Sequence, residues 1–508
     1  MTTYKKFGPP GTGKTTRLLA EVTDRLESGV NPLRIAYLAF TKKAASEARG
    51  RAVKLLGLSE SDQKEQLFYF RTLHSLCYQL LSISDKKVIT ESDYKKFGKR
   101  VNLDFDVSID EERRTKTNNP IISLLSLYRL KMSTLREEYN KTDLNYAWNE
   151  VDFIDRSYQE FKKTFRLIDY TDMLTEFESI MHLVLPKTFS LICIDESQDL
   201  SPLQWKIASN LQNHTEDLIL AGDDDQAIYG FTGASPEEFL SFEGEAEVLN
   251  QSYRTPKSIY RLISGIINTI PSNKRQQKTY LPKEEEGSVR RINSLQELDF
   301  SSGEWLILAQ ANYMLDTVAE DLKSAGYLFM RNGGRSISYN LTTAIVTWER
   351  LRKGKEVSAS NVQIMYKYMT GNGGKVQRGF KKLNVSDGLF LSYDQLVSDY
   401  GLLASVDEIW SEALDSKTIT VDKTYVTSIL RKGDDSFHLK TPRIQLSTIH
   451  GAKGGEAQNV VVFLDLTTAA IKNNENYENH RVFYVACSRP TENLYLVEPQ
   501  DYNRSFVI

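Results

Sequence analysis

Residues 8–15 have the types and the spacing of a phosphate-binding loop. They read Gly-Pro-Pro-Gly-Thr-Gly-Lys-Thr and match the pattern G-x-x-x-x-G-K-[ST] in full. Glycines let the backbone fold around a phosphate so that several N–H groups point at it, and a helix beginning near Lys14 adds the positive end of its dipole. Lys14 would reach the β- and γ-phosphates of a nucleotide, and the Thr15 hydroxyl would bind Mg²⁺. The alternative is a glycine-rich turn that only caps a helix.

Two apolar strands predicted further along the chain also end in polar residues. Leu191–Ile194 is followed by Asp195 and Glu196, the Walker B arrangement, in which Asp195 would hold Mg²⁺ and Glu196 would activate the attacking water. A carboxylate pair alone also fits the acidic first turn of a helix. The second strand, Leu218–Ala221, leads to Gln226, which could sense the γ-phosphate. The three motifs together favour nucleotide hydrolysis over a purely structural reading.

The elements that must position these residues are short apolar strands alternating with helical patterns, which is typical of parallel α/β domains. The predicted strands are Ile35–Phe40, Leu191–Ile194, Leu218–Ala221, Trp305–Ala309, Ile444–Thr448, Val460–Leu464 and Leu494–Val497. Two long, mainly helical stretches interrupt the alternation, Ser84 to about Arg166 and Lys353 to about Lys440, and both are predicted to be insertions.

Length and composition limit the classes to which the protein can belong. A chain of 508 residues predicts three or four domains, and a net charge of −3 leaves room for a basic groove but not for a uniformly basic surface. No apolar run approaches about 18 residues, and no apolar segment follows the first charges, so we expect neither a membrane span nor a secretory signal. Three widely spaced cysteines exclude a CxxC metal site and a dense disulfide framework.

Eight motifs in order resemble the UvrD/Rep/PcrA family of superfamily 1 DNA helicases. They are Gly8–Thr15, Ala39–Ala45, Thr72–Ser75, Asp195–Asp199, Gly222–Ala234, Gln251–Thr255, Thr448–Glu456 and Tyr484–Arg489. The resemblance implies an α/β fold with two RecA-like P-loop domains, each carrying a mainly helical inserted subdomain. It predicts domain 1A at 1–83 and 167–249, subdomain 1B at 84–166, domain 2A at 250–349 and 441–508, and subdomain 2B at 350–440.

The resemblance also implies roles for individual residues. Catalysis would involve Lys14, Asp195, Glu196, Gln226, Arg254 and Arg489, with Mg²⁺ on Thr15 and Asp195. Tyr253 would stack on adenine, Glu456 would lie near the ribose, and Arg254 and Arg489 would reach the γ-phosphate across a cleft between two domains. The ATP-binding set is Gly8, Pro9, Pro10, Gly11, Thr12, Gly13, Lys14, Thr15, Thr16, Tyr253, Arg254, Glu456 and Arg489. The residues expected to contact DNA are Phe40, Thr41, Thr72, His74, Ser75, Phe231, Thr448 and His450.

The function implied is an ATP- and Mg²⁺-dependent helicase moving 3′→5′ on single-stranded DNA and unwinding junctions, in replication, repair or recombination. Proteins of those processes would be its partners, in the cytoplasm of a bacterium or a phage-infected host. Two alternatives stay open: a translocase that strips proteins from DNA without efficient unwinding, and a nucleotide-controlled binding switch. An RNA helicase and a helicase–nuclease are less favoured.

The sequence departs from the family in several places. No Q-motif precedes Gly8, so the motifs do not predict selectivity for adenine. Phe231 and Thr232 replace the Trp-Arg of the family, and the chain ends soon after Arg489, which predicts a compact, phage-type member. The basic segment Gly371–Lys382 is a candidate for contact with duplex DNA, with a solvated surface loop as the alternative.

Overall fold

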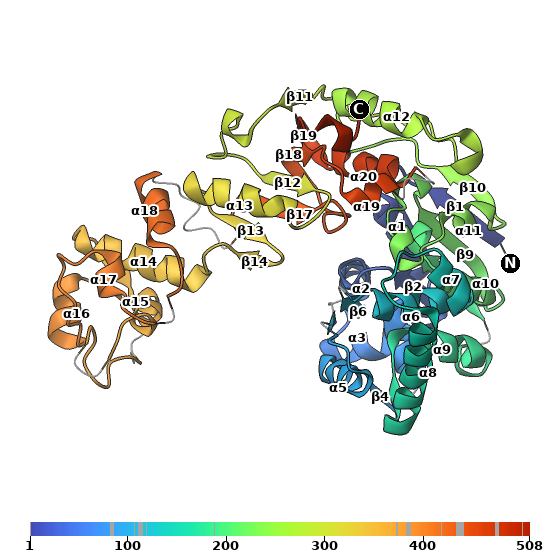
Figure 1. Cartoon of the computed structure of the whole chain (residues 1–508), viewed down its shortest axis with the longest axis horizontal. Coiled ribbons are helices and arrows are strands. Elements are labelled where there is room, and N and C mark those ends of the chain that lie inside the picture. Colours follow the sequence, from blue (N-terminus) through green and yellow to red (C-terminus); the bar gives the residue numbers. More distant parts are fainter. Residues whose placement is uncertain are drawn as a thin grey trace. The chain divides into compact units, whose positions relative to one another are not determined.

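The computed structural model describes residues 2–81, 86–105, 107–109, 115–117, 119–186, 188–371, 374–382, 388–417, 419–432, 441–472, 477–499 and 501–508. Their contacts divide the chain into two compact units. Unit 1 comprises residues 1–285 and 474–485, and unit 2 comprises residues 286–473 and 486–508 (Figure 1). The predicted subdomain limits at residues 84 and 440 lie outside the described residues.

Unit 1 is built on a parallel sheet of six strands in the order β10-β1-β9-β8-β2-β3. The strands are β1 (Thr2–Phe7), β2 (Ile35–Ala39), β3 (Phe70–Thr72), β8 (Phe189–Ile194), β9 (Thr215–Gly222) and β10 (Glu245–Val248). Strands β2 and β8 are buried at every residue, which explains their continuous apolar sequences. The three strands predicted in this half of the chain are confirmed.

Helices cover both faces of this sheet, because successive strand residues point to opposite sides. Leu191 and Cys193 pack in one core with α1 (Lys14–Glu27) and α2 (Lys42–Leu56). Ile192 and Ile194 pack in the other core with α4 (Leu73–Leu80), α9 (Tyr170–Val184), α10 (Pro202–Gln212) and α11 (Pro236–Ser241). Short α3 (Glu60–Gln66) joins α2 to the edge strand, and α12 (Lys257–Asn268) completes the helices of residues 1–81 and 168–285.

Residues 86–167 form a separate, mainly helical core within unit 1. Its helices are α5 (Glu91–Val101), α6 (Pro120–Leu130), α7 (Leu135–Asn140) and α8 (Trp148–Phe165). Short strand pairs, β4 (Lys87–Val88) with β7 (Leu167–Ile168) and β5 (Val107–Ile109) with β6 (Thr115–Thr117), complete it. The buried aromatic side chains of this core include Tyr94, Phe97, Tyr158 and Phe161, so the predicted helical stretch has a hydrophobic core of its own.

A buried ion cluster joins this helical core to α9. The Asp169 carboxylate lies 2.8 Å from Arg129 and 2.8 Å from Lys162, and it also accepts from the Tyr158 hydroxyl. It caps α9 by accepting the backbone N–H of Asp172 at 2.8 Å. Burial alone would raise the pKa of Asp169, but the two cations hold this pKa well below its usual value.

We expect Asp169→Asn to destabilise unit 1 by about 3–5 kcal/mol at pH 7, because two buried cations lose a partner. When the pKa of a carboxyl group is lower in the folded state, the charged group stabilises the fold at pH values above its unfolded-state pKa of about 4, and this stabilisation is lost as the pH falls further. The difference in free energy of unfolding between wild type and variant should therefore decrease only at acid pH. Urea denaturation at several pH values measures it. The control Asp152→Asn removes a charge from an exposed i,i+4 pair with Arg156 and should change stability by less than about 0.5 kcal/mol.

Unit 2 contains a second sheet, in the order β11-β19-β18-β12-β17-β13-β14. The strands are β11 (Ser288–Ile292), β12 (Trp305–Ala309), β13 (Phe329–Arg331), β14 (Gly334–Arg335), β17 (Ile444–Thr448), β18 (Ala457–Phe463) and β19 (Pro490–Val497). All neighbours are parallel except β13 and β14. Helices α13 (Met314–Ser324) and α19 (Thr468–Lys472) follow strands of this sheet along the chain. Helix α20 (Glu478–Cys487) precedes β19, and its residues 478–485 group with unit 1. The four strands predicted in this half are confirmed.

A helical core also lies within unit 2. It contains α14 (Tyr339–Arg352), α15 (Ala359–Lys367), α16 (Tyr393–Asp399), α17 (Trp410–Ala413), α18 (Lys423–Lys432) and the pair β15 (Val357–Ser358) and β16 (Phe390–Leu391). The predicted limit at residue 350 falls inside α14, whose Ile345 and Trp348 pack in this core. Within the described residues, no helix is long and apolar enough to cross a membrane.

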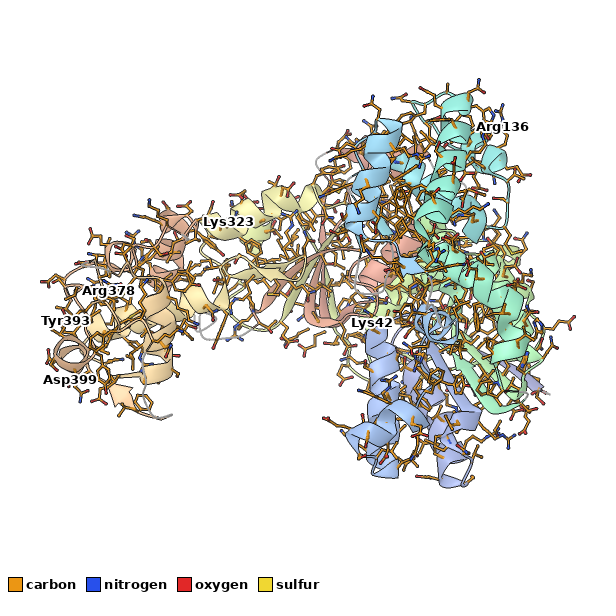
Figure 2. The ribbon with its side chains drawn as sticks, turned by 90° about the horizontal axis from the view of Figure 1, so that it is seen from below. Lys42, Arg136, Lys323, Arg378, Tyr393 and Asp399 are labelled. Carbon is orange, nitrogen blue, oxygen red and sulfur yellow. The ribbon has the colours of Figure 1, made fainter. Side chains whose placement is uncertain are left out.

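The basic segment 371–382 is fixed to this helical core where it is described; Asn372 and Gly373 lie outside the described residues. Val376 forms a β-bridge with Leu402, and Lys375 pairs with Glu408. Arg378 and Lys381 are exposed. Figure 2 shows Arg378 and Tyr393 on this helical part of unit 2.

Candidate functional site

The predicted site residues of unit 1 follow the carboxyl ends of its parallel strands. The phosphate loop follows β1, the Asp223–Gln226 segment follows β9, Asp195 follows β8, Phe40 follows β2, and Thr72 ends β3. Because the strand order is β1-β9-β8-β2-β3, the expected nucleotide residues up to Gln226 follow three adjacent strands. The expected DNA residues from Phe40 to Ser75 lie at the ends of the next two strands, and Phe231 lies beyond β9. Ligands of open α/β sheets bind at this edge.

The phosphate loop depends on its glycines. Gly11 and Gly13 have φ values of 72° and 76°, in the left-handed region that favours glycine. A Cβ on Gly8 would lie 1.9 Å from Cγ of Lys14, so only glycine leaves room for that side chain. The Lys14 ammonium donates to the Gly8 carbonyl at 2.8 Å, and α1 begins at this lysine. The loop therefore places a cation and a helix N-terminus together, as phosphate binding requires.

Asp195 and Thr15 meet as the two motifs predict. The Thr15 hydroxyl donates to Asp195 Oδ2 at 2.8 Å, and the Tyr37 hydroxyl donates to the same oxygen at 2.9 Å. Burial, with a smaller effect of Glu196, raises the pKa of Asp195 to about 6, and the Thr15 and Tyr37 hydrogen bonds and Lys14 oppose the rise. Tyr37 was not predicted, because a tyrosine inside a buried strand carries no motif.

The donor set at Thr15 and Asp195 fits Mg²⁺, which prefers oxygen ligands and is usually held by one or two protein groups together with substrate phosphates. Among the described residues, no group of three or more His, Cys, Asp or Glu is arranged to hold a metal. Thr15 and Asp195 would hold Mg²⁺ together with the phosphates of a bound nucleotide and water, and the ion would supply charge neutralisation.

Glu196 and Gln226 are linked through polar side chains. Glu196 has a left-handed φ of 55°, and its carboxylate accepts from Gln198 Nε2 at 2.6 Å. Gln198 Oε1 accepts the backbone N–H of Asp223 at 2.9 Å, and the Gln226 amide donates to Asp223 Oδ2 at 2.6 Å. The predicted water-activating carboxylate and the predicted γ-phosphate sensor thus share one hydrogen-bonded network.

Tyr253 and Arg254 lie against the phosphate loop. The Tyr253 N–H donates to the Gly11 carbonyl at 2.9 Å, and the Ser252 hydroxyl donates to the Pro10 carbonyl at 2.7 Å. The Tyr253 side chain is 76% exposed, which leaves its ring accessible for stacking on a base. Residues 250–285 group by contacts with unit 1, although the resemblance predicts them in domain 2A. Arg254 therefore approaches the loop from within the same unit.

Four of the predicted residues, Thr448, His450, Glu456 and Arg489, belong to unit 2, where the structure brings two of them together. Arg489 is 1% exposed and donates to the Gly455 carbonyl at 3.3 Å, next to Glu456. Thr448 ends β17, its hydroxyl accepts the Gly451 N–H at 3.1 Å, and His450 follows. Glu456 and Arg489 thus precede β18 and β19, whereas Thr448 and His450 lie at the carboxyl end of β17.

An aromatic row extends from the Asp223–Gln226 segment of unit 1. The rings of Phe40 and Tyr229 are stacked with centroids 5.8 Å apart, and those of Tyr229 and Phe231 lie 6.2 Å apart. Phe231 is 65% exposed, so it is not a core residue. Tyr229 was not among the predicted residues. The sequence feature that could have indicated it is its position two residues before Phe231.

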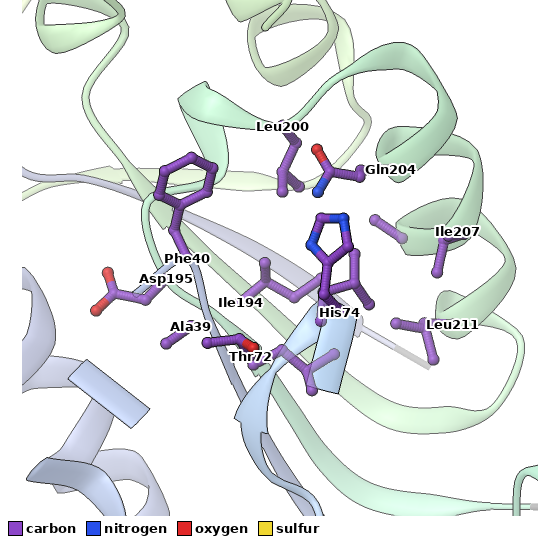
Figure 3. Close-up of a pocket in the computed structure, with 13 residues that line it drawn as sticks. Ala39, Phe40, Thr72, His74, Ile194, Asp195, Leu200, Gln204, Ile207 and Leu211 are labelled. Atoms are coloured by element: carbon purple, nitrogen blue, oxygen red, sulfur yellow. The ribbon is translucent and has the colours of Figure 1, made fainter. Parts of the chain in front are cut away.

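A pocket beside this row is lined by residues of both predicted sets, those for the nucleotide and those for DNA. It is lined by Phe40, Thr72, His74 and Asp195 together with apolar residues of β8 and α10 (Figure 3). The hydroxyl of Thr72 caps α4 by accepting the Ser75 N–H, and Thr41 caps α2 in the same way. These hydroxyls therefore sit at helix N-termini, where backbone N–H groups also favour phosphate.

Comparison with known proteins shows to which family this arrangement belongs. The profile of the UvrD/REP helicase N-terminal domain matches residues 7–247, and that of the UvrD-like helicase C-terminal domain matches residues 401–500. The chain belongs to the UvrD/Rep helicase family. Within this family it is 28% identical over 273 residues to the ATP-dependent DNA helicase PcrA of Staphylococcus epidermidis, a match that covers 51% of the chain and 37% of that relative.

A second UvrD/Rep relative matches a part of the chain of similar length and with similar identity. The PcrA helicase of Staphylococcus aureus strain Mu50 is 26% identical over 279 residues, which cover 52% of the chain and 38% of that protein. The matched part therefore spans little more than a third of the length of these relatives. The parallel sheets of both units agree with the α/β, RecA-like fold of UvrD/Rep helicases.

Proposed function

We propose that the chain is a DNA-dependent ATPase that moves 3′→5′ along single-stranded DNA and unwinds duplex, in replication, repair or recombination. The observation that carries the proposal is the continuity from Gln226 to Phe231. The first donates to Asp223 in the nucleotide half of the site, and the second, five residues later, is the exposed end of the aromatic row. A change at the γ-phosphate would thereby reach the rings on which bases stack.

Each predicted residue then has a defined task. Lys14 and the loop N–H groups bind the phosphates, Glu196 takes the proton of the attacking water, and Gln226 contacts the γ-phosphate. Arg254 and Arg489 stabilise the transition-state charge. Tyr253 stacks on the base and Glu456 contacts the ribose. Phe40, Tyr229 and Phe231 offer stacking surfaces, while Thr41, Thr72, His74, Ser75, Thr448 and His450 contact the strand.

The proposed four-part organisation places 1B at 84–166 and 2B at 350–440. The separate hydrophobic cores of residues 89–167 and 328–429 support two inserted helical subdomains, the second of which begins before residue 350. Arg378 and Lys381 of the exposed basic segment would contact duplex DNA ahead of the strand.

The deciding experiment measures ATP hydrolysis with and without single-stranded DNA, RNA and duplex, in parallel with fork unwinding. We expect strong stimulation by single-stranded DNA and unwinding of forks with a 3′ tail. Efficient displacement of streptavidin without unwinding would identify a protein-stripping translocase. Nucleotide-dependent DNA binding with no directional movement would identify a switch and would contradict the proposal.

Phe231→Ala should uncouple hydrolysis from movement. Losing the ring removes roughly 1–3 kcal/mol of stacking per base, so the strand slips while the phosphate chemistry is untouched. We expect ATPase at saturating DNA to stay within a few-fold of wild type and fork unwinding to fall roughly tenfold or more. Phe153→Ala, which removes a ring that is 56% exposed on α8, is the matched control and should change neither activity. Unchanged unwinding in Phe231→Ala would mean that this ring does not take part in the movement along DNA.

A further inference from the structure

Lys278 belongs to no motif of the predicted site, yet its side chain lies beside that site. The surrounding residues Gln277 and Thr279 are exposed, whereas the Lys278 side chain is 1% exposed. Its ammonium lies 2.8 Å from Asp223 Oδ1 and 2.9 Å from Asp225 Oδ2, and it also contacts Asp224. A lysine that reaches inward from a surface segment to three buried carboxylates makes a specific contact, because an unpaired buried charge is strongly unfavourable.

The three carboxylates have different additional partners. Arg275 binds Asp225 through two nitrogens, and the backbone N–H of Gln276 donates to Asp224 at 3.0 Å. Arg481 donates to the Asp224 carbonyl at 3.0 Å. Within the described residues, Lys278 is the only ion-pair partner of Asp223. Burial would raise the pKa of Asp223, but Lys278 and Lys14 hold this pKa below its usual value, which keeps the carboxylate charged.

Asp223 in turn orients the two polar groups nearest the proposed chemistry. Its Oδ2 accepts the Gln226 amide at 2.6 Å, and its N–H donates to Gln198, which donates to Glu196. The position of Asp223 therefore decides where the Gln226 amide points and how Gln198 meets Glu196.

We propose that Lys278 is a positioning residue for ATP hydrolysis, acting through Asp223 on Gln226 and on the Gln198–Glu196 pair. The inference rests on the proposed ATPase function. Without the ammonium, only Asp225 would keep an ion pair, with Arg275, among the ion pairs described for the three buried carboxylates, so their repulsion would displace Asp223 or protonate it. In either case Gln226 loses its fixed acceptor, and a misplacement of about 1 Å in such a site can lower the rate roughly 10²-fold.

The test uses Lys278→Met and Lys278→Arg in the full chain, with ATP–Mg²⁺ and saturating oligothymidylate. We expect kcat to fall about 10–10²-fold in Lys278→Met, with KM within about threefold, because the phosphate loop is unchanged. Lys278→Arg keeps the charge and should fold even if Lys278→Met does not. Its kcat should still fall, because the guanidinium cannot reproduce the three contacts, but by a smaller factor than in Lys278→Met, because the charge is retained. Lys283→Met, on the same segment, removes a pair with the exposed Glu285 and should match wild type.

A double-mutant cycle separates positioning from general stability. In a Gln226→Ala background, adding Lys278→Met should lower kcat by a smaller factor than in wild type, because one of the two groups that Lys278 positions is already gone. The same fold-loss in both backgrounds would overturn the inference, as would folded Lys278→Arg and Lys278→Met with wild-type kcat. If wild-type protein hydrolyses ATP in these experiments, only the positioning role fails; if it does not, the proposed function fails.

Discussion

Lys14→Ala is expected to abolish DNA-stimulated ATP hydrolysis while leaving single-strand binding nearly intact. The Lys14 ammonium sits over the phosphate loop, 2.8 Å from the Gly8 carbonyl. Loss of one such preorganised charge lowers turnover roughly 10²–10³-fold. Phe40 and Thr72 lie at the carboxyl ends of β2 and β3, which β9 and β8 separate from β1, so the binding of single-stranded DNA at these residues should not change.

Steady-state ATPase assays and fluorescence anisotropy with oligothymidylate measure the two activities on one preparation. Lys54→Ala, at an exposed position of α2, is the matched control for removing a lysine. Single-strand binding by both variants should weaken steeply with salt, as in wild type, because each neutralised phosphate releases counterions. Equal loss of hydrolysis and binding in Lys14→Ala would mean that the lysine supports the fold rather than the phosphates.

The strands and the positions of the motifs could be predicted from the sequence for a simple physical reason. Parallel strands covered on both faces must be continuous apolar runs, and ligand-binding residues follow their carboxyl ends. Strands β12 and β17 were therefore predicted to the residue, and the Thr15–Asp195 contact follows from two motifs that share one sheet edge.

Contacts between distant residues could not be predicted in this way. Lys278 and Asp223 are 55 positions apart, and nothing local distinguishes Lys278 from a surface lysine. Similarly, the contact of Ser252 with the Pro10 carbonyl, which holds Arg254 to the phosphate loop, joins residues 242 positions apart. Tertiary packing decides such partners, and no period or spacing in the sequence reports it.

The exposure of Phe231 is a related case. An aromatic residue read from sequence alone is more often buried in a core than exposed. In the structure its ring is 65% exposed and lies beside Tyr229, because the short helical turn at Gly230–Thr232 ends in Gly233 with a φ of 93°. The backbone turn, rather than the residue type, places the ring on the surface.

Glu196→Gln is expected to separate nucleotide binding from hydrolysis more sharply than any other single change in unit 1. Asp195, Thr15 and Lys14 all remain, so binding of ATP–Mg²⁺ should be retained. Glutamine keeps the size of the side chain and an oxygen that can accept from Gln198 Nε2, which lies 2.6 Å from the carboxylate. Only the charge and the proton-accepting oxygen are lost, and such a loss typically lowers turnover about 10²–10⁴-fold.

A filter-binding or fluorescent-nucleotide assay should therefore give an affinity within about threefold of wild type, while single-turnover hydrolysis becomes very slow. Glu238→Gln, at an exposed position of α11, is the matched control and should leave both quantities unchanged. The variant should also hold single-stranded DNA in the ATP-bound state, because the step that would end this state is blocked. Near-normal turnover would mean that another group takes the proton of the attacking water, and Glu196 would then serve only to orient Gln198.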